Sequence, residues 1–128
     1  MPVLRLIGYW RSDEQPWWPN PRDFIDALWH DDGRRVLIRF LLAGTTARVH
    51  RGWSDCRFCG EQNGDRDFTD GTYLWPEGLA HYVRVHGLRL PQEFISHAEE
   101  RIGTIHAAVD TIETVETNDS WWAAQRHP

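Results

Sequence analysis

The strongest constraint on the fold of this chain is the spacing of two cysteines and two histidines near its middle. Cys56 and Cys59 form a C-x2-C pair, and His81 and His86 form an H-x4-H pair after residues 60–80. Thiolates and imidazoles are the ligands that zinc prefers in proteins, and pairs at these spacings are common in zinc sites. The pattern therefore predicts one zinc ion bound by Cys56, Cys59, His81 and His86.

The two histidines can meet at one ion only if their helix is distorted. The residues from Pro76 to His86 predict a helix that ends at Gly87. Five residues turn an ideal α-helix through about 500°, which leaves the rings of His81 and His86 about 140° apart. We therefore expect the last turn before Gly87 to be wider or tighter than in an ideal helix.

The number of ligands decides what the ion can do. Four protein ligands close a zinc site and make it structural, whereas three leave a position for water and catalysis. The sequence predicts the closed site, with no catalytic residue and no second cofactor site. If His86 did not bind, Cys56, Cys59 and His81 would form an open site of the kind that zinc hydrolases use.

Other interpretations of these residues remain open. The cysteines could form a redox pair, but such pairs usually begin a helix, and residues 60–64 are instead rich in turn formers. The four residues could be unrelated core residues. A ββα nuclease would need a histidine near the first strand of the hairpin, and we find none there.

The rest of the chain predicts a small α+β domain around this site. Residues 3–10 predict an N-terminal strand, and residues 20–29 and 31–44 predict two helices that form a helical hairpin, the second ending with Gly44 in a left-handed conformation. Residues 45–53 predict a strand that leads into the cysteines. Asp70-Gly71 predicts a type I′ turn, which joins two short strands into a hairpin.

A long C-terminal helix is predicted from Pro91 onward. Its apolar residues recur in steps of three and four, as in an a/d seam: Ile95, Ala98, Ile102, Ile105, Val109 and Ile112. The threonine-rich residues 111–117 could instead be extended, and no structure is predicted after Asn118. We expect one zinc-stabilised domain over residues 1–117 and a tail over residues 118–128. The seam could pack on its own domain or on a second copy of the chain.

Composition narrows the classes of function. A chain of 128 residues is about one small domain, and such domains often need a metal for stability. The net charge of −5 disfavours general nucleic-acid binding, which depends on neutralising phosphates. A local patch of arginines, namely Arg48, Arg51, Arg57 and Arg66, keeps a DNA- or RNA-binding regulator as an alternative. All 14 basic residues are arginine, either through codon bias or through selection.

The chain lacks the patterns of a membrane or secreted protein. No apolar run approaches the about 18 residues that a membrane-spanning helix needs. The first residues show neither the apolar segment nor the cleavage site of a secretory signal. We therefore expect a soluble, cytoplasmic protein with no membrane partner.

The centre of the chain resembles a group of small, functionally uncharacterised bacterial zinc-binding proteins. The likeness runs roughly from residue 50 to residue 96 and rests on Cys-Arg-Phe-Cys-Gly at 56–60, Thr-Asp-Gly-Thr-Tyr-Leu-Trp-Pro-Glu-Gly-Leu-Ala-His-Tyr-Val at 69–83, His86, and Leu-Pro-x-Glu-Phe at 90–94. It implies a bacterial cytosolic origin and a structural zinc of zinc-finger or treble-clef type. It implies no activity. The ligand pairs are farther apart than the about 12 residues of a C2H2 finger, which reads DNA through its helix.

Taken together, the residues predict a non-enzymatic zinc-binding interaction or adaptor module. The predicted partner is another protein or a second copy of the chain, bound through the C-terminal helix. A DNA- or RNA-binding regulator is the alternative. A small zinc hydrolase or nuclease is the third hypothesis, and it requires the fourth ligand to be absent.

Overall fold

A mixed sheet of five strands organises the structure, a computed structural model that describes residues 3–29, 31–102 and 116–125. The strands are β1 (Val3–Leu6), β2 (Thr45–Asp55), β3 (Gln62–Thr69), β4 (Tyr73–Pro76) and β5 (Glu116–Asn118). They lie in the order β2-β3-β4-β1-β5. The first three of these are antiparallel, and β1 pairs in parallel with both β4 and β5.

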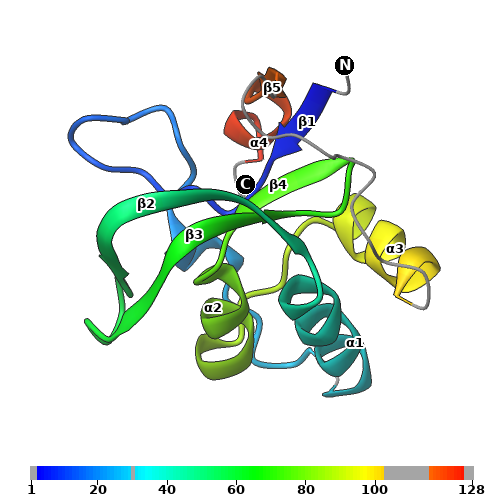
Figure 1. The fold of residues 1–128 in the computed structure, drawn as a ribbon. Coiled ribbons are helices and arrows are strands. Elements are labelled where there is room, and N and C mark those ends of the chain that lie inside the picture. Colours follow the sequence, from blue (N-terminus) through cyan, green and yellow to red (C-terminus); the bar gives the residue numbers. More distant parts are fainter. Residues whose placement is uncertain (1–2, 30, 103–115, 126–128) are drawn as a thin grey trace.

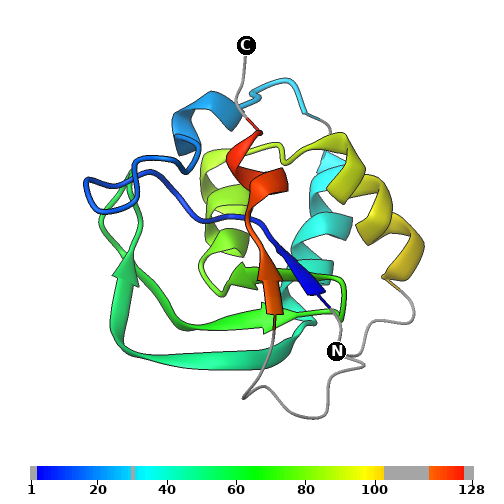
Figure 2. The same ribbon diagram turned by 90° about the horizontal axis from the view of Figure 1, so that it is seen from above.

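Helices lie on one side of this sheet. They are α1 (Asp31–Leu42), α2 (Leu79–His86) and α3 (Gln92–Arg101), and α1 contacts both of the others (Figure 1). A short α4 (Ser120–Ala123) directly follows β5 (Figure 2). The combination of helices with a mixed sheet is an α+β fold, as the sequence predicts. No helix in the described part of the chain has the length and apolar character needed to cross a membrane.

Aromatic side chains fill the core. Trp75, Phe40 and Phe94 are fully buried between the sheet and the helices, and the indole N–H of Trp75 donates to a carbonyl oxygen of α1 (3.1 Å). Trp122 of α4 is also fully buried and packs edge-on against Trp10, with ring centroids 5.4 Å apart. Burying a side chain such as Phe94 stabilises a fold by about 1.5–3 kcal/mol. This core fixes the sheet and helices that position the candidate site.

The predicted first helix, over residues 20–29, is wrong. Asn20 caps a helical turn as expected, but that turn is a 3-10 helix of four residues, Pro21–Phe24. Ile25 is extended and forms an antiparallel bridge with Leu88. Backbone hydrogen bonds to the segment after α2 thus replace those that would continue the helix. As a result, α1 has no helical partner before it, and the predicted helical hairpin does not form.

The predicted left-handed conformation of Gly44 is also wrong. α1 ends at Leu42, and Gly44 is not among the glycines with positive φ. A Cβ at this position would lie 2.7 Å from Cζ2 of Trp75 and 2.9 Å from Cβ of Phe68. Gly44 is therefore required by close packing against the sheet, and not by backbone conformation.

The strands around the cysteines are predicted well. β2 begins at Thr45 as expected and continues to Asp55, and β3 and β4 form the predicted antiparallel hairpin. The turn between them is not type I′, because that turn needs positive φ at both central residues and Asp70 does not have it. Instead, the carboxylate of Asp70 accepts the N–H groups of Thr72 and Tyr73.

The C-terminal region is described only in part. α3 covers Gln92–Arg101, and two residues of the predicted seam, Ile95 and Ala98, are buried in its own fold. The rest of the predicted helix, over residues 103–112, lies outside the described residues. The threonine-rich stretch is extended at its end, where β5 begins, and α4 forms where no structure was predicted. The division into a domain of residues 1–117 and a tail of residues 118–128 stays a prediction.

Candidate metal centre

The two cysteines lie on a tight turn between β2 and β3. Cys56 directly follows β2, and its N–H donates to the carbonyl of Glu61 (2.8 Å). Gly60 donates its N–H to the carbonyl of Cys56 (2.9 Å) and has a φ of 76°, which residues with a side chain rarely adopt. Within this turn Cys56 is buried and Cys59 is exposed.

Helix α2 brings both histidines to the cysteines. His86 Nε2 lies 3.3 Å from Cys56 Sγ, and His81 Nε2 lies 3.4 Å from Cys59 Sγ. One ligand atom from each of the four residues lies within 4.8 Å of all the others. A tetrahedral zinc ion with bonds of about 2.0–2.3 Å would hold its ligand atoms about 3.3–3.8 Å apart. The four residues singled out by the sequence therefore lie close enough together to hold a metal ion.

The last turn of α2 is widened, as the H-x4-H spacing requires. The N–H of Gly87 donates to the carbonyl of Tyr82, five residues back, where an α-helix would use the residue four back. Arg34 of α1 donates to the carbonyls of Val83 (2.9 Å) and Arg84 (2.9 Å). Gly87 itself is left-handed, with a φ of 68°. The two imidazole rings consequently approach to 5.2 Å between centroids.

Aromatic contacts hold the cysteine turn against α2. The ring of Phe58 lies 4.8 Å from that of His86 and 5.8 Å from that of Tyr82. The hydroxyl of Tyr82 accepts the N–H of Arg57 (2.8 Å), and burial raises the pKa of Tyr82 to about 12. A neutral hydroxyl thus anchors the backbone between the two cysteines at all ordinary pH values.

The electrostatics of the cluster favour a bound cation. A backbone hydrogen bond from Glu61 lowers the pKa of Cys59, but desolvation and the nearby Cys56 and Glu61 outweigh it, so the pKa lies above its ordinary value. Desolvation, and then the charge of His81, lower the pKa of His86. The imidazole of His86 is therefore neutral and ready to bind a metal. The thiolate of Cys59 is disfavoured until a positive charge joins it.

Several residues of the site could not be found from the spacing of the ligands. Glu61 places Oε2 3.8 Å from Cys59 Sγ and 4.0 Å from His81 Nε2. Its position two residues after Cys59 is the one feature of the sequence that indicates a role at the site. No feature of the sequence indicates the role of Arg34, because it lies about fifty residues before the carbonyls that it binds. Its role depends on how α1 packs on α2.

Three of the four arginines near the site are engaged by acceptors within the protein. Arg48 pairs with Asp67 (3.0 Å), Arg66 pairs with Asp65 (3.0 Å), and Arg57 donates to a backbone carbonyl of the loop after β1 (2.7 Å). In the described part of the chain, only Arg51 of the four makes no ion pair or hydrogen bond. The patch therefore offers one free guanidinium, where contact with a phosphate backbone would use several.

Comparisons with known proteins return no match. No family model, no curated protein and no solved structure matches the chain. The resemblance of residues 50–96 to small bacterial zinc-binding proteins stays a prediction.

Proposed function

We propose that this protein is a non-enzymatic interaction module whose fold depends on one structural zinc ion. The observation that supports it is the approach of Cys56 Sγ, Cys59 Sγ and two imidazole nitrogens to within 4.8 Å of one another. Two thiolates with two imidazoles suit zinc, whereas magnesium and calcium prefer oxygen ligands. The ligands of the ion are Cys56, Cys59, His81 and His86.

The zinc in this proposal is structural because its ligand set is complete. With His86 beside Cys56, four protein ligands surround the ion and no position remains for a reacting water. The ion joins the end of β2 to α2. The outer part of β2 has little apolar support, since its residues 48–55 are all exposed. Binding of the ion is thereby coupled to the folding of this part.

The proposed interaction surface is the outer part of β2. This strand is at the edge of the sheet, and two large apolar side chains, Val49 and Trp53, are exposed on it. An exposed edge strand is a common site for adding a strand from a partner. The predicted alternative, a partner at the C-terminal seam, has less support, because Ile95 and Ala98 are buried within the same chain. The setting in a bacterial cytosol remains part of the proposal.

The test is a measurement of metal content and coordination. Protein purified without added chelator should contain one zinc per chain by plasma mass spectrometry, and Cys59→Ser and His86→Gln should each lose it. His50→Gln, a histidine outside the cluster, should keep it. Cobalt in place of zinc should give the absorption of a tetrahedral site, unchanged by added cyanide or azide.

Two results would contradict the proposal. A metal-free protein with an unchanged melting curve would remove the structural role. A cobalt spectrum that shifts when azide is added would reveal an open coordination position, and the hydrolase hypothesis would then replace the present one.

A further inference from the structure

A groove between α1 and α2 lies apart from the proposed surface on β2. Its volume is about 440 Å³. Ile38 and Leu42 line it from α1, and Ala80 and Arg84 line it from α2. Residues four apart on a helix share one face, so each helix turns a continuous face toward the groove. Leu42 is 60% exposed there, which leaves an aliphatic side chain for a partner to cover.

Arg84 brings a free positive charge to this groove. No ion pair or hydrogen bond engages its guanidinium within the part of the chain that the structure describes, and the same holds for Arg35 and Arg39 of α1. Arg35 precedes Ile38 by three residues and Arg39 precedes Leu42 by three, so both arginines neighbour the apolar residues of the groove on the surface of α1. Although the net charge of the chain is −5, this face is locally basic. An unpaired guanidinium binds carboxylates well, often through two parallel hydrogen bonds.

Two carboxylates also line the groove, and both face groups of the protein. Oε1 of Glu77 accepts the N–H of Asp65 (3.0 Å) and lies 3.9 Å from Nε of Arg66. Glu61 places Oε2 3.8 Å from Cys59 Sγ, where a bound metal ion would attract it. A nucleic-acid strand fits this groove less well than a peptide, because its phosphates would pass close to both carboxylates.

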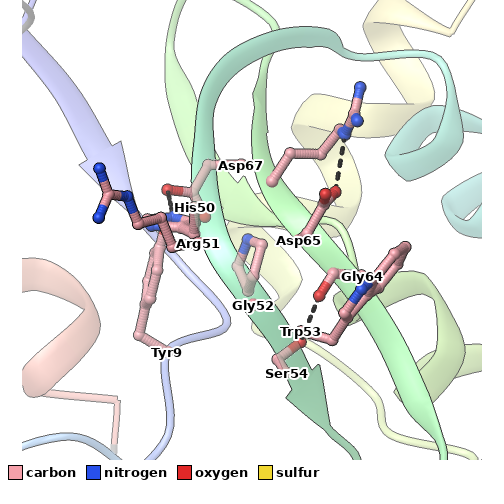
Figure 3. A pocket seen from close by; sticks show the side chains of 11 residues that line it. Tyr9, His50, Arg51, Gly52, Trp53, Ser54, Gly64, Asp65 and Asp67 are labelled. Atoms are coloured by element: carbon pink, nitrogen blue, oxygen red, sulfur yellow. Dashed lines mark hydrogen bonds and ion pairs between the residues drawn. The ribbon is translucent and has the colours of Figure 1, made fainter.

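The cavity in the ribbon of β2 and β3 does not bring its free groups together in this way. Residues 50–53 of β2 bulge opposite the single residue Asp65 of β3 and open a cavity of about 320 Å³ (Figure 3). Figure 3 shows Arg51 and Trp53 on opposite sides of β2. The buried carboxylate of Asp67 already has two basic side chains beside it. The groove between the helices is therefore the better place for a ligand that combines charge with an apolar group.

We propose that the groove between α1 and α2 binds a peptide segment of a partner protein in which an aliphatic side chain lies next to Asp or Glu. The aliphatic side chain packs on the apolar residues of the two helices, and the carboxylate pairs with Arg84. Arg35 and Arg39 attract further acidic residues of the same segment. His81 belongs both to the groove and to the metal cluster. The inference thus rests on the proposed zinc-dependent interaction module and adds the chemistry of a partner.

Fluorescence anisotropy of labelled decapeptide pools, titrated with the zinc-loaded protein, tests the proposal. In the first pool, aliphatic residues alternate with Asp and Glu. In the second, Asn and Gln replace the acids, and in the third, Ser replaces the aliphatic residues. The first pool should bind. Each of the others should bind at least about tenfold more weakly, because each lacks one half of the recognition.

Variants locate the bound peptide. Arg84→Gln and Leu42→Ser should each weaken binding of the first pool about fivefold or more and leave the melting temperature unchanged, because both side chains are exposed. Leu28→Ser, at an 89% exposed leucine outside the groove, is the matched control and should keep full affinity. Arg51→Gln, at an unpaired arginine on β2, tells the two surfaces apart. If it weakens binding and Arg84→Gln does not, the peptide lies on β2, which overturns this inference and leaves the proposed function standing.

Other outcomes would overturn the groove as a peptide site. The absence of binding by the first pool at millimolar peptide would do so, and so would equal binding of the second pool. A single-stranded oligonucleotide that binds more tightly, with an affinity that falls steeply with salt and is lost in Arg84→Gln, would replace the peptide with a nucleic acid. A dimer in sedimentation that Arg84→Gln dissociates would replace it with a second copy of the chain.

Zinc is measured in every variant, so that failure of this inference and failure of the proposed function are distinguishable. A zinc-replete protein that fails to bind the first pool overturns this inference alone. A zinc-free protein that binds it with full affinity overturns only the structural zinc.

Discussion

Two polar clusters join helices to the sheet, and their polar groups are satisfied in different ways. Asp70, at the turn between β3 and β4, is fully buried, and its Oδ2 lies 2.5 Å from Nε2 of His97 and 3.6 Å from Nε of Arg101 on α3. Its Oδ1 accepts two backbone N–H groups. The cluster of Cys56, Cys59 and the two histidines of α2 has no such internal counter-charge.

The difference separates what the chain can fold unaided from what depends on a ligand. At Asp70, protein groups of opposite charge meet, so α3 is fastened by the polypeptide alone. At the cysteines, two sulfur atoms, one of them on an exposed residue, face the imidazoles of α2, and Glu61 adds a negative charge. A bound cation would stabilise that arrangement. We therefore expect α3 and the centre of the sheet to stay folded when α2 and the outer part of β2 do not.

Loss of zinc should have the largest effect and should be confined to one side of the molecule. In Cys59→Ser, an exposed residue is changed, so its packing matters little and the metal is the main loss. At a free zinc concentration a thousand times Kd, the lost stabilisation is about 4 kcal/mol. Hydrogen exchange read by mass spectrometry should show loss of protection over residues 48–55 and α2, with α3 and the centre of the sheet retained. Uniform loss of protection would break the comparison between the two clusters.

Removing the charge of Asp70 should destabilise the cluster that holds α3 and leave the zinc site intact. Asp70→Asn keeps an oxygen for the two backbone N–H groups and leaves His97 and Arg101 without their carboxylate. Breaking a buried ion pair in this way costs about 3 kcal/mol or more. Urea unfolding should report that loss, while the zinc content stays at one per chain. Asp13→Asn, an exposed aspartate in the loop after β1, is the control. Loss of zinc from Asp70→Asn would show that the clusters are not independent.

The pH dependence should also differ between the clusters. Zinc binds thiolates, and the pKa of Cys59 lies above its ordinary value, so binding at pH 7 must release a proton from Cys59. His86 contributes none, because its pKa is lowered and its imidazole is already neutral. Zinc affinity should therefore fall at least about tenfold for each unit by which the pH is lowered below 7.

Calorimetry in two buffers that differ in enthalpy of ionisation counts the released protons directly. At least about one proton per zinc is expected. A count near zero would mean that the thiols are ionised before the metal arrives. The contrast with Asp70, whose charge is balanced by groups of the protein itself, would then disappear. Titration of Cys59→Ser under the same conditions should give neither the heat of site formation nor the proton release.

The grouping of Cys56, Cys59, His81 and His86 was predictable because the information for it is local. Two short spacings and a glycine place sulfur and nitrogen atoms with little help from the rest of the fold, and the expected distortion of α2 is present at Gly87. Two of the wrong predictions involve partners that are distant in the sequence. Ile25 leaves its helix to pair with Leu88, and Gly44 is needed because Trp75 packs against it.

The cavity lined by residues 50–54 of β2 and residues 64–67 of β3 also could not be predicted from local sequence. Its residues come from β2, β3 and the segment after β1, and the bulge that opens it depends on how two strands are paired. The sequence grouped Arg48, Arg51, Arg57 and Arg66 by proximity. Only the fold shows which of these arginines are occupied by carboxylates and carbonyls.

The smallest predicted effect tests whether the shape of α2 matters for the metal. Gly87→Ala places a side chain at a φ of 68° and should cost about 1 kcal/mol. Gly52→Ala imposes similar strain at a φ of 82°, with no atom within 4 Å of the new Cβ, and is the matched control. Both variants should lose similar stability in urea unfolding. Only Gly87→Ala should also weaken zinc binding in competition with a chelator, because only there does relief of the strain move His86. Equal zinc affinity in the two variants would show that the cluster tolerates a regular helix end, and that the widened last turn serves the packing of Arg34 rather than the metal.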